Sequence, residues 1–238
     1  MEFTFPAIGI VHSCFKEKFG IPRQPGLAPL STARIELFPP YDDPQAFEGI
    51  ETTSHVWVQW VFHANKRTEW KPRVKPPRLG GNKTLGVFAT RSPTRPAPIG
   101  LSVVKFERLE QADGKLWLHI SGVDMLDQTP VLDIKPYVPY SDSLPLATND
   151  FADAAPTLLP VGFTNTAMAV CDNYLHRQQT DLKNLIIQVL QQDPRPSYQS
   201  AESDKVYAMQ LLDMDIHWVY QSSPSGTVIL VTELRPLA

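Results

Sequence analysis

The chain has 238 residues, of which 42% are hydrophobic, 20% charged and 10% aromatic, and its formal net charge is −3. This composition is typical of a globular protein of one or two domains and excludes low-complexity disorder and fibrous architecture. No apolar run approaches the roughly 18 residues of a membrane span, and the first residues lack the basic and apolar regions of a signal peptide, so we expect a cytoplasmic protein with no membrane contact.

Strands dominate the predicted elements of the first 140 residues. The 23 prolines are about twice the usual share of about 5%, and proline interrupts long helices. Alternating, β-branched and aromatic runs predict seven strands, at residues 6–13, 33–38, 54–62, 84–90, 99–109, 115–123 and 131–137. In the clearest run, residues 54–62, Val56, Val58 and Trp60 share one face, and a capped short helix is predicted at 43–47. The pattern predicts a β-barrel or a β-sandwich.

Residues 138–160 are polar and carry four prolines, which predicts a linker between domains at residues 1–145 and 160–238. In the second domain, Thr180 is expected to cap a helix over residues 181–192. One face of that helix is apolar through Leu182, Leu185, Ile186, Val189 and Leu190. Strands are predicted at residues 205–220 and 227–234, joined by a hairpin signal at 221–226. The expected fold class is α+β, predominantly β.

Positive charge is concentrated in the middle of the chain. Residues 66–110 contain 11 Lys and Arg residues against 3 Asp and Glu, whereas both flanking parts are acidic. Such a segment suits a surface that contacts phosphates, because each cation near a phosphate releases counterions. A solvated loop whose charges only maintain solubility is the alternative.

Two proline-braced loops carry side chains that packing does not require. Residues 22–27 present Arg23 and Gln24, and residues 86–101 present Arg91 and Arg95. A guanidinium on a rigid backbone favours binding of an anion or a carboxylate. An exposed turn is the alternative for the first loop, and a β-bulge or strand end is the alternative for the second.

Other polar residues give weaker signals. Asp133 and Lys135 fall on one face of a predicted strand, as partners in a site or as a plain structural ion pair. His63 follows the aromatic strand, where it lines a pocket or pairs with backbone. Cys14 and Cys171 are expected to be free thiols, and the six histidines lack metal-ligand spacing, so no metal site is predicted.

The run Gly-Val-Phe-Ala-Thr-Arg-Ser-Pro-x-Arg-Pro-x-Pro-Ile-Gly-Leu at residues 86–101 resembles the signature of the TsaA/TrmO family of tRNA adenosine N6-methyltransferases. Further matching stretches lie at residues 16–19, 22–27, 73–82, 133–137 and 193–198. The chain departs from the pattern at Ala97, where the family has Asn.

The resemblance implies a homodimer with an N-terminal single-sheeted β-barrel that binds S-adenosyl-L-methionine and a small α+β C-terminal domain. The implied reaction is methylation of N6 of N6-threonylcarbamoyladenosine at position 37 of a threonine tRNA. By matching position, the cofactor site would comprise Gln24, Pro25, Gly26, Leu27, His63, Ala64, Arg91, Leu101, Val131, Leu132, Asp133 and Ile134. Within it, Arg91 is expected to hold the methionine carboxylate.

The resemblance also implies catalytic and RNA-binding residues. Asp133 is expected to accept the proton or to orient Lys135 and Tyr137. Residues expected to hold tRNA phosphates are Lys66, Arg67, Lys71, Arg73, Lys75, Arg78 and Arg195, and the target base must be splayed out. Two alternatives remain: a noncatalytic tRNA-binding protein with a retained nucleotide pocket, and a small-molecule methyltransferase that shares the cofactor site.

Overall fold

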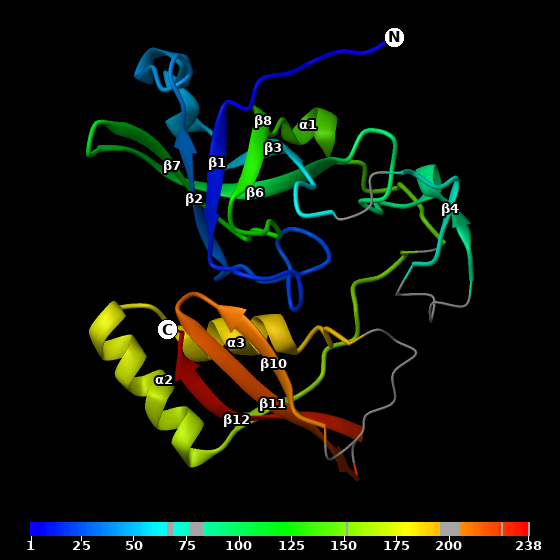
Figure 1. The fold of residues 1–238 in the computed structure, drawn as a ribbon, viewed down its shortest axis with the longest axis vertical. Coiled ribbons are helices and arrows are strands. Elements are labelled where there is room, and N and C mark those ends of the chain that lie inside the picture. Colours follow the sequence, from blue (N-terminus) through cyan, green and yellow to red (C-terminus); the bar gives the residue numbers. More distant parts are fainter. Residues whose placement is uncertain (66–68, 77–82, 151, 196–204, 225, 238) are drawn as a thin grey trace.

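Six antiparallel strands close into a β-barrel, drawn at the top of Figure 1. The strands are β1 (Gly9–Ser13), β2 (Thr32–Leu37), β3 (His55–Val61), β6 (Ile99–Ala112), β7 (Lys115–Ser121) and β8 (Thr129–Pro136), in the order β1-β2-β7-β6-β3-β8. The structure is a computed structural model and describes all residues except 66–68, 77–82, 151, 196–204, 225 and 238. A single closed sheet is therefore confirmed, and the sandwich alternative is wrong.

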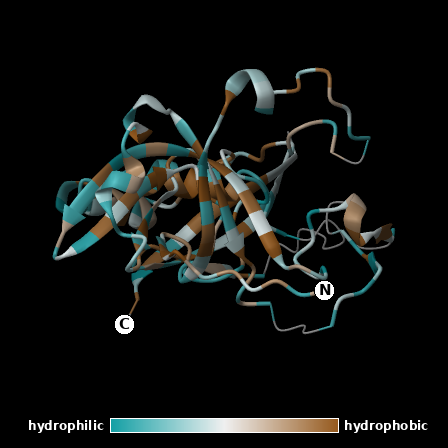
Figure 2. Ribbon diagram, turned by 90° about the horizontal axis from the view of Figure 1, so that it is seen from above, coloured by the Kyte–Doolittle hydropathy of each residue, from teal (hydrophilic) through white to brown (hydrophobic). Residues whose placement is uncertain are grey.

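The apolar residues that alternate with polar ones along the strands form the core of the barrel. Val56, Val58 and Trp60 of β3 are buried, as predicted, and their neighbours in sequence are half-exposed. Figure 2 shows the same alternation of brown and teal along the strands. The 3-10 helix η1 (Pro44–Phe47) is also confirmed, since Asp43 Oδ1 accepts a hydrogen bond from Gln45 N and Pro44 occupies the first position.

The predicted strand at residues 84–90 is wrong. Only β5 (Leu85–Gly86) is extended, and it pairs with β4 (Arg73–Val74) in a separate two-stranded sheet. The chain then turns into the 3-10 helix η4 (Val87–Ala89), because Thr90 returns hydrogen bonds from both its N–H and its hydroxyl to the Val87 carbonyl. Earlier in the chain, a second short 3-10 helix, η2 (Ile50–Thr52), lies between η1 and β3.

A four-stranded sheet in the order β10-β11-β12-β9 forms the second domain, in the lower half of Figure 1. Its strands are β9 (Val161–Phe163), β10 (Tyr207–Leu211), β11 (Met214–Ser223) and β12 (Gly226–Pro236). Helices α2 (Asn165–Gln178) and α3 (Leu182–Leu190) accompany it, and no helix among the described residues is long and apolar enough to cross a bilayer. The α+β, predominantly β class is thus confirmed, and we keep the limits 1–145 and 160–238 as a proposal.

Two sequence predictions in this domain need correction, and one helix was missed. The apolar face of α3 is buried as expected, but Asp181 rather than Thr180 caps the helix, through a bond from Asn184 N. Residues 205–220 form two strands, because Leu212 adopts a left-handed φ of 57° and reverses the chain. Helix α2 escaped detection because only Ala167, Cys171 and Tyr174 of its 14 residues are buried, which leaves a weak periodicity.

The loop between β1 and β2 joins the two domains. Cys14 O accepts a hydrogen bond from Leu212 N, and Glu17 accepts one from Gln210 N. The Phe19 ring stacks on Trp218 at 5.9 Å between centroids, and Gln192 Nε2 donates to Leu27 O. The C-terminal domain therefore holds this proline-rich loop against the end of the barrel.

Candidate active site

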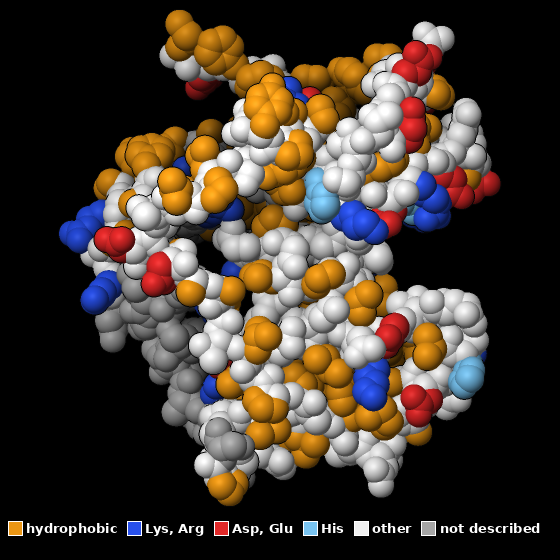
Figure 3. Space-filling view, turned by 180° about the vertical axis from the view of Figure 1, so that it is seen from behind, with side chains coloured by type: hydrophobic (Ala, Val, Ile, Leu, Met, Phe, Trp, Pro, Cys, Tyr) orange, Lys and Arg blue, Asp and Glu red, His pale blue; other side chains and the backbone are white. Residues whose placement is uncertain are grey.

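A cavity of about 580 Å³ lies at the end of the barrel that faces the C-terminal domain. It is bounded by parts of residues 18–24, 60–65, 90–101 and 124–129, which bring three of the segments singled out in the sequence together. Figure 3 shows the molecule hollowed between its upper and lower halves. The volume of the cavity falls within the range of about 300–1,000 Å³ that is typical of small-molecule and cofactor sites.

Aromatic residues form one wall of the cavity. The rings of Trp60 and Phe62 meet edge to face at 4.3 Å between centroids. The Trp60 indole lies flat against Gly100, its register partner on β6, and a Cβ on Gly100 would lie 2.5 Å from Trp60 Cδ2 and closer still to the neighbouring ring atoms. The glycine of the Pro-Ile-Gly-Leu run is thus required by the close approach of an indole.

A hydrogen-bonded chain leads from that indole to a carboxyl group. Trp60 Nε1 donates to Ser102 Oγ at 2.9 Å, and Ser102 Oγ donates to Asp124 Oδ1 at 2.6 Å. Burial raises the pKa of Asp124 to about 6, although the Ser102 hydroxyl and the charge of Arg91 act in the opposite direction. Since an Asp of an unfolded chain titrates near 4, Asp124 contributes stability below about pH 4 that is lost as the pH rises through about 6. Its charged form is therefore kept at a cost in stability at neutral pH.

The other titratable residues of the described lining are basic. Arg91 donates to the side-chain oxygen of Gln24, although the two residues are 67 positions apart. Arg95 Nη1 donates to Thr90 O at 2.9 Å and braces the loop that carries Arg91. His63 Nδ1 lies 3.4 Å from Thr129 Oγ1. The cavity thus offers a preorganised guanidinium suited to a carboxylate.

The structure brings part of the predicted cofactor set to this cavity. The lining includes Gln24, His63, Ala64, Arg91 and Leu101. Pro25, Gly26 and Leu27 do not line it. Gly26 has a left-handed φ of 77°, and its N–H donates to Gly122 O.

The predicted stretch Val131, Leu132, Asp133 and Ile134 does not line the cavity, and the preceding segment contributes Asp124, Leu126 and Thr129 instead. Val131 is fully buried in the barrel core. Sequence reasoning missed Asp124 and the Trp60 wall. The signal for Asp124 was a lone carboxylate inside the apolar run Val123-Asp124-Met125.

The predicted catalytic residues also lie away from the cavity. Asp133 and Lys135 form an ion pair on β8, with side chains 42% and 60% exposed, as the structural alternative required. The Tyr137 ring packs near Trp57 at 6.0 Å between centroids. A catalytic role for these three residues stays a prediction.

Exposed cations and aromatic rings gather around β4, and we call Trp70, Lys71, Arg73, Lys75 and Phe88 the β4 surface. Trp70 and Phe88 are 50% and 74% exposed, and the three cations are exposed as well. The hydrogen bond from Val87 N to Pro72 O joins the two parts of this surface. The predicted RNA-binding residues Lys66, Arg67 and Arg78 lie outside the described residues.

Arg195 has a different environment from the other predicted RNA-binding residues. Its side chain is 9% exposed and forms a two-point ion pair with Asp193, at 2.9 and 2.7 Å. Its guanidinium also lies 3.7 Å from the Tyr220 ring centroid, and Arg23 donates to its carbonyl oxygen. These contacts favour a structural role at the domain junction over direct phosphate binding.

Both parts of the chain match models of known protein families. The family model of the tRNA-methyltransferase O N-terminal domain matches residues 10–143, and that of the TrmO C-terminal domain matches residues 156–237. An Escherichia coli tRNA (adenine(37)-N6)-methyltransferase is 42% identical over 219 residues, which cover 91% of this chain and 93% of that protein. A Pseudomonas aeruginosa protein named "Putative S-adenosylmethionine-dependent methyltransferase RcsF" is 48% identical, with 92% and 94% covered. The crystal structure of TrmO from Pseudomonas aeruginosa superposes with a TM-score of 0.81 at 42% identity and covers 99% of both chains.

Proposed function

The chain belongs to the tRNA-methyltransferase O family, and from this premise we propose that it methylates N6 of N6-threonylcarbamoyladenosine at position 37 of threonine tRNA in the cytoplasm. It is an S-adenosyl-L-methionine-dependent enzyme that methylates adenine of tRNA. The observation that supports the proposal best is the cavity in which Gln24 holds Arg91, in a chain that matches both family domains.

The residues of the cavity fit this cofactor. Arg91 is oriented for a carboxylate, Trp60 and Phe62 provide apolar contact for a nucleoside, and the volume suffices. When bound, S-adenosyl-L-methionine supplies a methyl group that its sulfonium has already activated. The task left to the chain is therefore alignment, which accounts for loops stiffened by proline and cross-linked by side chains.

Methylation of defined tRNA tests the proposal. Purified protein and labelled cofactor are incubated with threonine tRNA that carries, or lacks, the threonylcarbamoyl group, and nucleosides are analysed by mass spectrometry. We expect one added methyl on the carbamoylated adenosine. Methylation of unmodified adenosine would correct the substrate, and cofactor binding without any transfer would favour the noncatalytic tRNA-binding alternative.

The β4 surface supports tRNA as the partner. Cations contact phosphates without regard to sequence, whereas exposed aromatic rings stack on bases splayed out of a loop. Trp70 and Phe88 next to Lys71, Arg73 and Lys75 combine both features. We place the anticodon loop against this surface.

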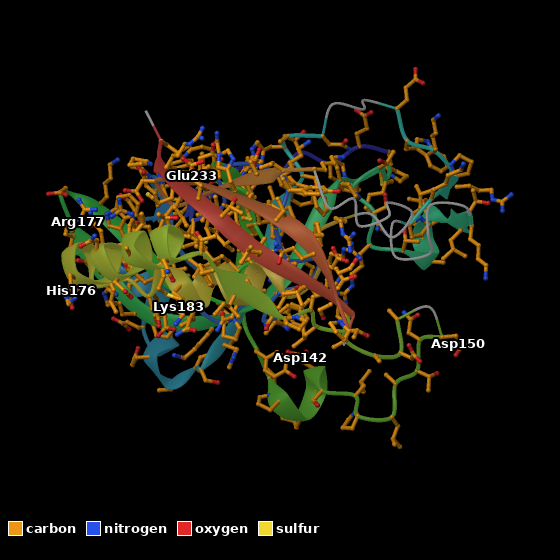
Figure 4. All side chains as sticks on the ribbon, turned by 90° about the horizontal axis from the view of Figure 1, so that it is seen from below. Asp142, Asp150, His176, Arg177, Lys183 and Glu233 are labelled. Atoms are coloured by element: carbon orange, nitrogen blue, oxygen red, sulfur yellow. The ribbon has the colours of Figure 1, made fainter. Side chains whose placement is uncertain are left out.

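Replacing Lys71, Arg73 and Lys75 together by Ala is expected to weaken tRNA binding and to lower the slope of log affinity against log salt by about 2, because each lost phosphate contact removes about 0.7–0.9 of slope. Filter binding at several salt concentrations measures this. The control replaces Arg177 and Lys183, which lie at the opposite end of the molecule in Figure 4, and should leave the slope unchanged. An unchanged slope in the triple variant would contradict tRNA binding here.

We also propose a homodimer in which a second copy covers the segment after β8. Its short helix α1 (Pro139–Asp142) is fixed to the barrel, because Asp142 Oδ2 accepts hydrogen bonds from Trp57 Nε1 and Val138 N. Figure 4 shows the chain from Asp142 to Asp150 running along the outside of the molecule. Tyr140, Leu144 and Leu146 are 92%, 73% and 94% exposed there, which is typical of side chains that a partner covers.

Replacing Leu144 and Leu146 together by Glu is expected to shift the protein from dimer to monomer, since each buried charge would cost more than the apolar contact it replaces. Sedimentation velocity over a range of protein concentrations measures the change. Exchange of Leu175 for Glu is the control, because this side chain is 45% exposed on α2 and outside the proposed interface. A dimer that persists in the double variant would place the interface elsewhere.

A further inference from the structure

One carboxylate stands among the basic groups of the cavity. The titratable or cationic residues that line it are Lys18, Arg23, His63, Arg91, Arg95 and Asp124. Of the described lining residues, Asp124 alone is acidic. An acidic group in a cavity built for an anionic moiety calls for a separate reason.

Hydrogen bonding fixes how this carboxylate is presented. An indole N–H only donates, so Ser102 Oγ accepts from Trp60 and must direct its own proton to Asp124 Oδ1. Asp124 is thereby an acceptor toward the protein and has remaining acceptor capacity for a donor inside the cavity. Because Trp60 is held against Gly100, the carboxylate has a rigid support.

The neighbourhood of Asp124 has the charge pattern of an amino-acid receptor. Arg91 and Asp124 line the same cavity, and the charge of Arg91 acts to lower the pKa of Asp124. In an α-amino acid the carboxylate and the ammonium group are carried by the same carbon, so a receptor needs opposite charges side by side. An ammonium also offers N–H donors to a carboxylate, which a sulfonium lacks.

We propose that Asp124 binds the α-ammonium group of the methionyl part of the cofactor while Arg91 binds its carboxylate. This inference rests on the proposed function and deepens it, because it assigns a residue to one end of the ligand. It also explains why a buried charge is retained at neutral pH despite its cost: the ligand's cation compensates the carboxylate. Desolvation of the Asp124 carboxylate, which raises its pKa, makes that compensation strong.

The test is calorimetric binding of three ligands to the full-length protein and to Asp124→Asn. S-adenosylmethionine and S-adenosylhomocysteine both carry the ammonium group, and only the first carries the sulfonium. 5′-Methylthioadenosine lacks the amino-acid part. We expect Asp124→Asn to weaken the first two alike, by about 10- to 100-fold, and the third by less than about 2-fold, since the loss is one charge-assisted hydrogen bond.

Each other outcome overturns the assignment in a defined way. Weakening of S-adenosylmethionine alone would assign Asp124 to the sulfonium, and unchanged affinity for all three with lost turnover would make it a proton acceptor. Equal weakening of all three would indicate a structural effect only. Should the parent protein bind none of the three ligands, the proposed function itself fails.

Asp127→Asn is the matched control. Asp127 is on the same segment, where it accepts from Ser13 N and pairs with Lys16 at 3.0 Å, and it does not line the cavity. Its replacement should leave all three affinities unchanged. The Asp124→Asn protein should also fold, with a thermal midpoint at pH 8 at or above that of the parent, because the uncharged amide removes a buried charge.

Discussion

Gly100→Ala is expected to destabilise the barrel by about 3 kcal/mol and to weaken cofactor binding. The added Cβ would overlap the Trp60 indole, which cannot retreat because it is 6% exposed and bonded to Ser102. Displacement of the indole would also break the support of Asp124. Urea unfolding and calorimetry measure the two losses.

Gly86→Ala provides the control for Gly100→Ala. Gly86 belongs to the same run at residues 86–101, but its φ is −59° and a Cβ there would meet nothing within 4 Å. We expect the free energy of unfolding to change by less than about 0.5 kcal/mol. If both substitutions cost the same, the close approach of Trp60 is not the reason for Gly100.

Arg195→Met is expected to cost about 3 kcal/mol of stability, because it leaves the half-buried Asp193 carboxylate without its cationic partner, although the Tyr220 side chain still donates to Oδ1 at 3.0 Å. Burial alone would raise the pKa of Asp193, but the hydrogen bonds and charge of Arg195 outweigh burial and lower it. The pair therefore stabilises the protein above the pKa of Asp in the unfolded chain, and this stabilisation is lost as the pH falls through the lowered value. The difference between parent and variant should accordingly shrink in acid.

Arg235→Met is the control that removes the same kind of ion pair from an exposed position. Arg235 forms the same two-point pair with a carboxylate two positions earlier, Glu233, but their side chains are 60% and 49% exposed. Its loss should leave the free energy of unfolding nearly unchanged, because solvent screens an exposed ion pair. For tRNA binding, Arg195→Met should leave the slope of log affinity against log salt unchanged, and a drop of about 1 in that slope would instead support a phosphate contact.

Local pattern was enough for the strands of the barrel and for α3, because alternation and a 3.6-residue period report directly which face is buried. Prediction from local pattern failed where a turn contained no typical turn residue or a helix had no clear apolar face. The reversal at Leu212 uses no glycine or proline, and α2 buries too few residues to show a period. In residues 84–90, β-branched and aromatic composition suggested a strand. The hydrogen bond from the Thr90 hydroxyl to the Val87 carbonyl instead stabilises the 3-10 helix η4.

The family likeness, the basic centre and the proline-stiffened loops are properties of the order of residues along the chain, and these the sequence alone determined. Which of them meet was decided by tertiary structure, since closure of the barrel sets contacts between residues far apart in sequence. Closure carried Arg91 to Gln24 and Trp60 to Ser102 and Asp124. On β8, Asp133 and Lys135 pair with each other, and packing of the two domains leaves Arg195 within their junction. The sequence gives the charge of each side chain, but the exposure and the partners of that side chain depend on which residues the fold packs around it.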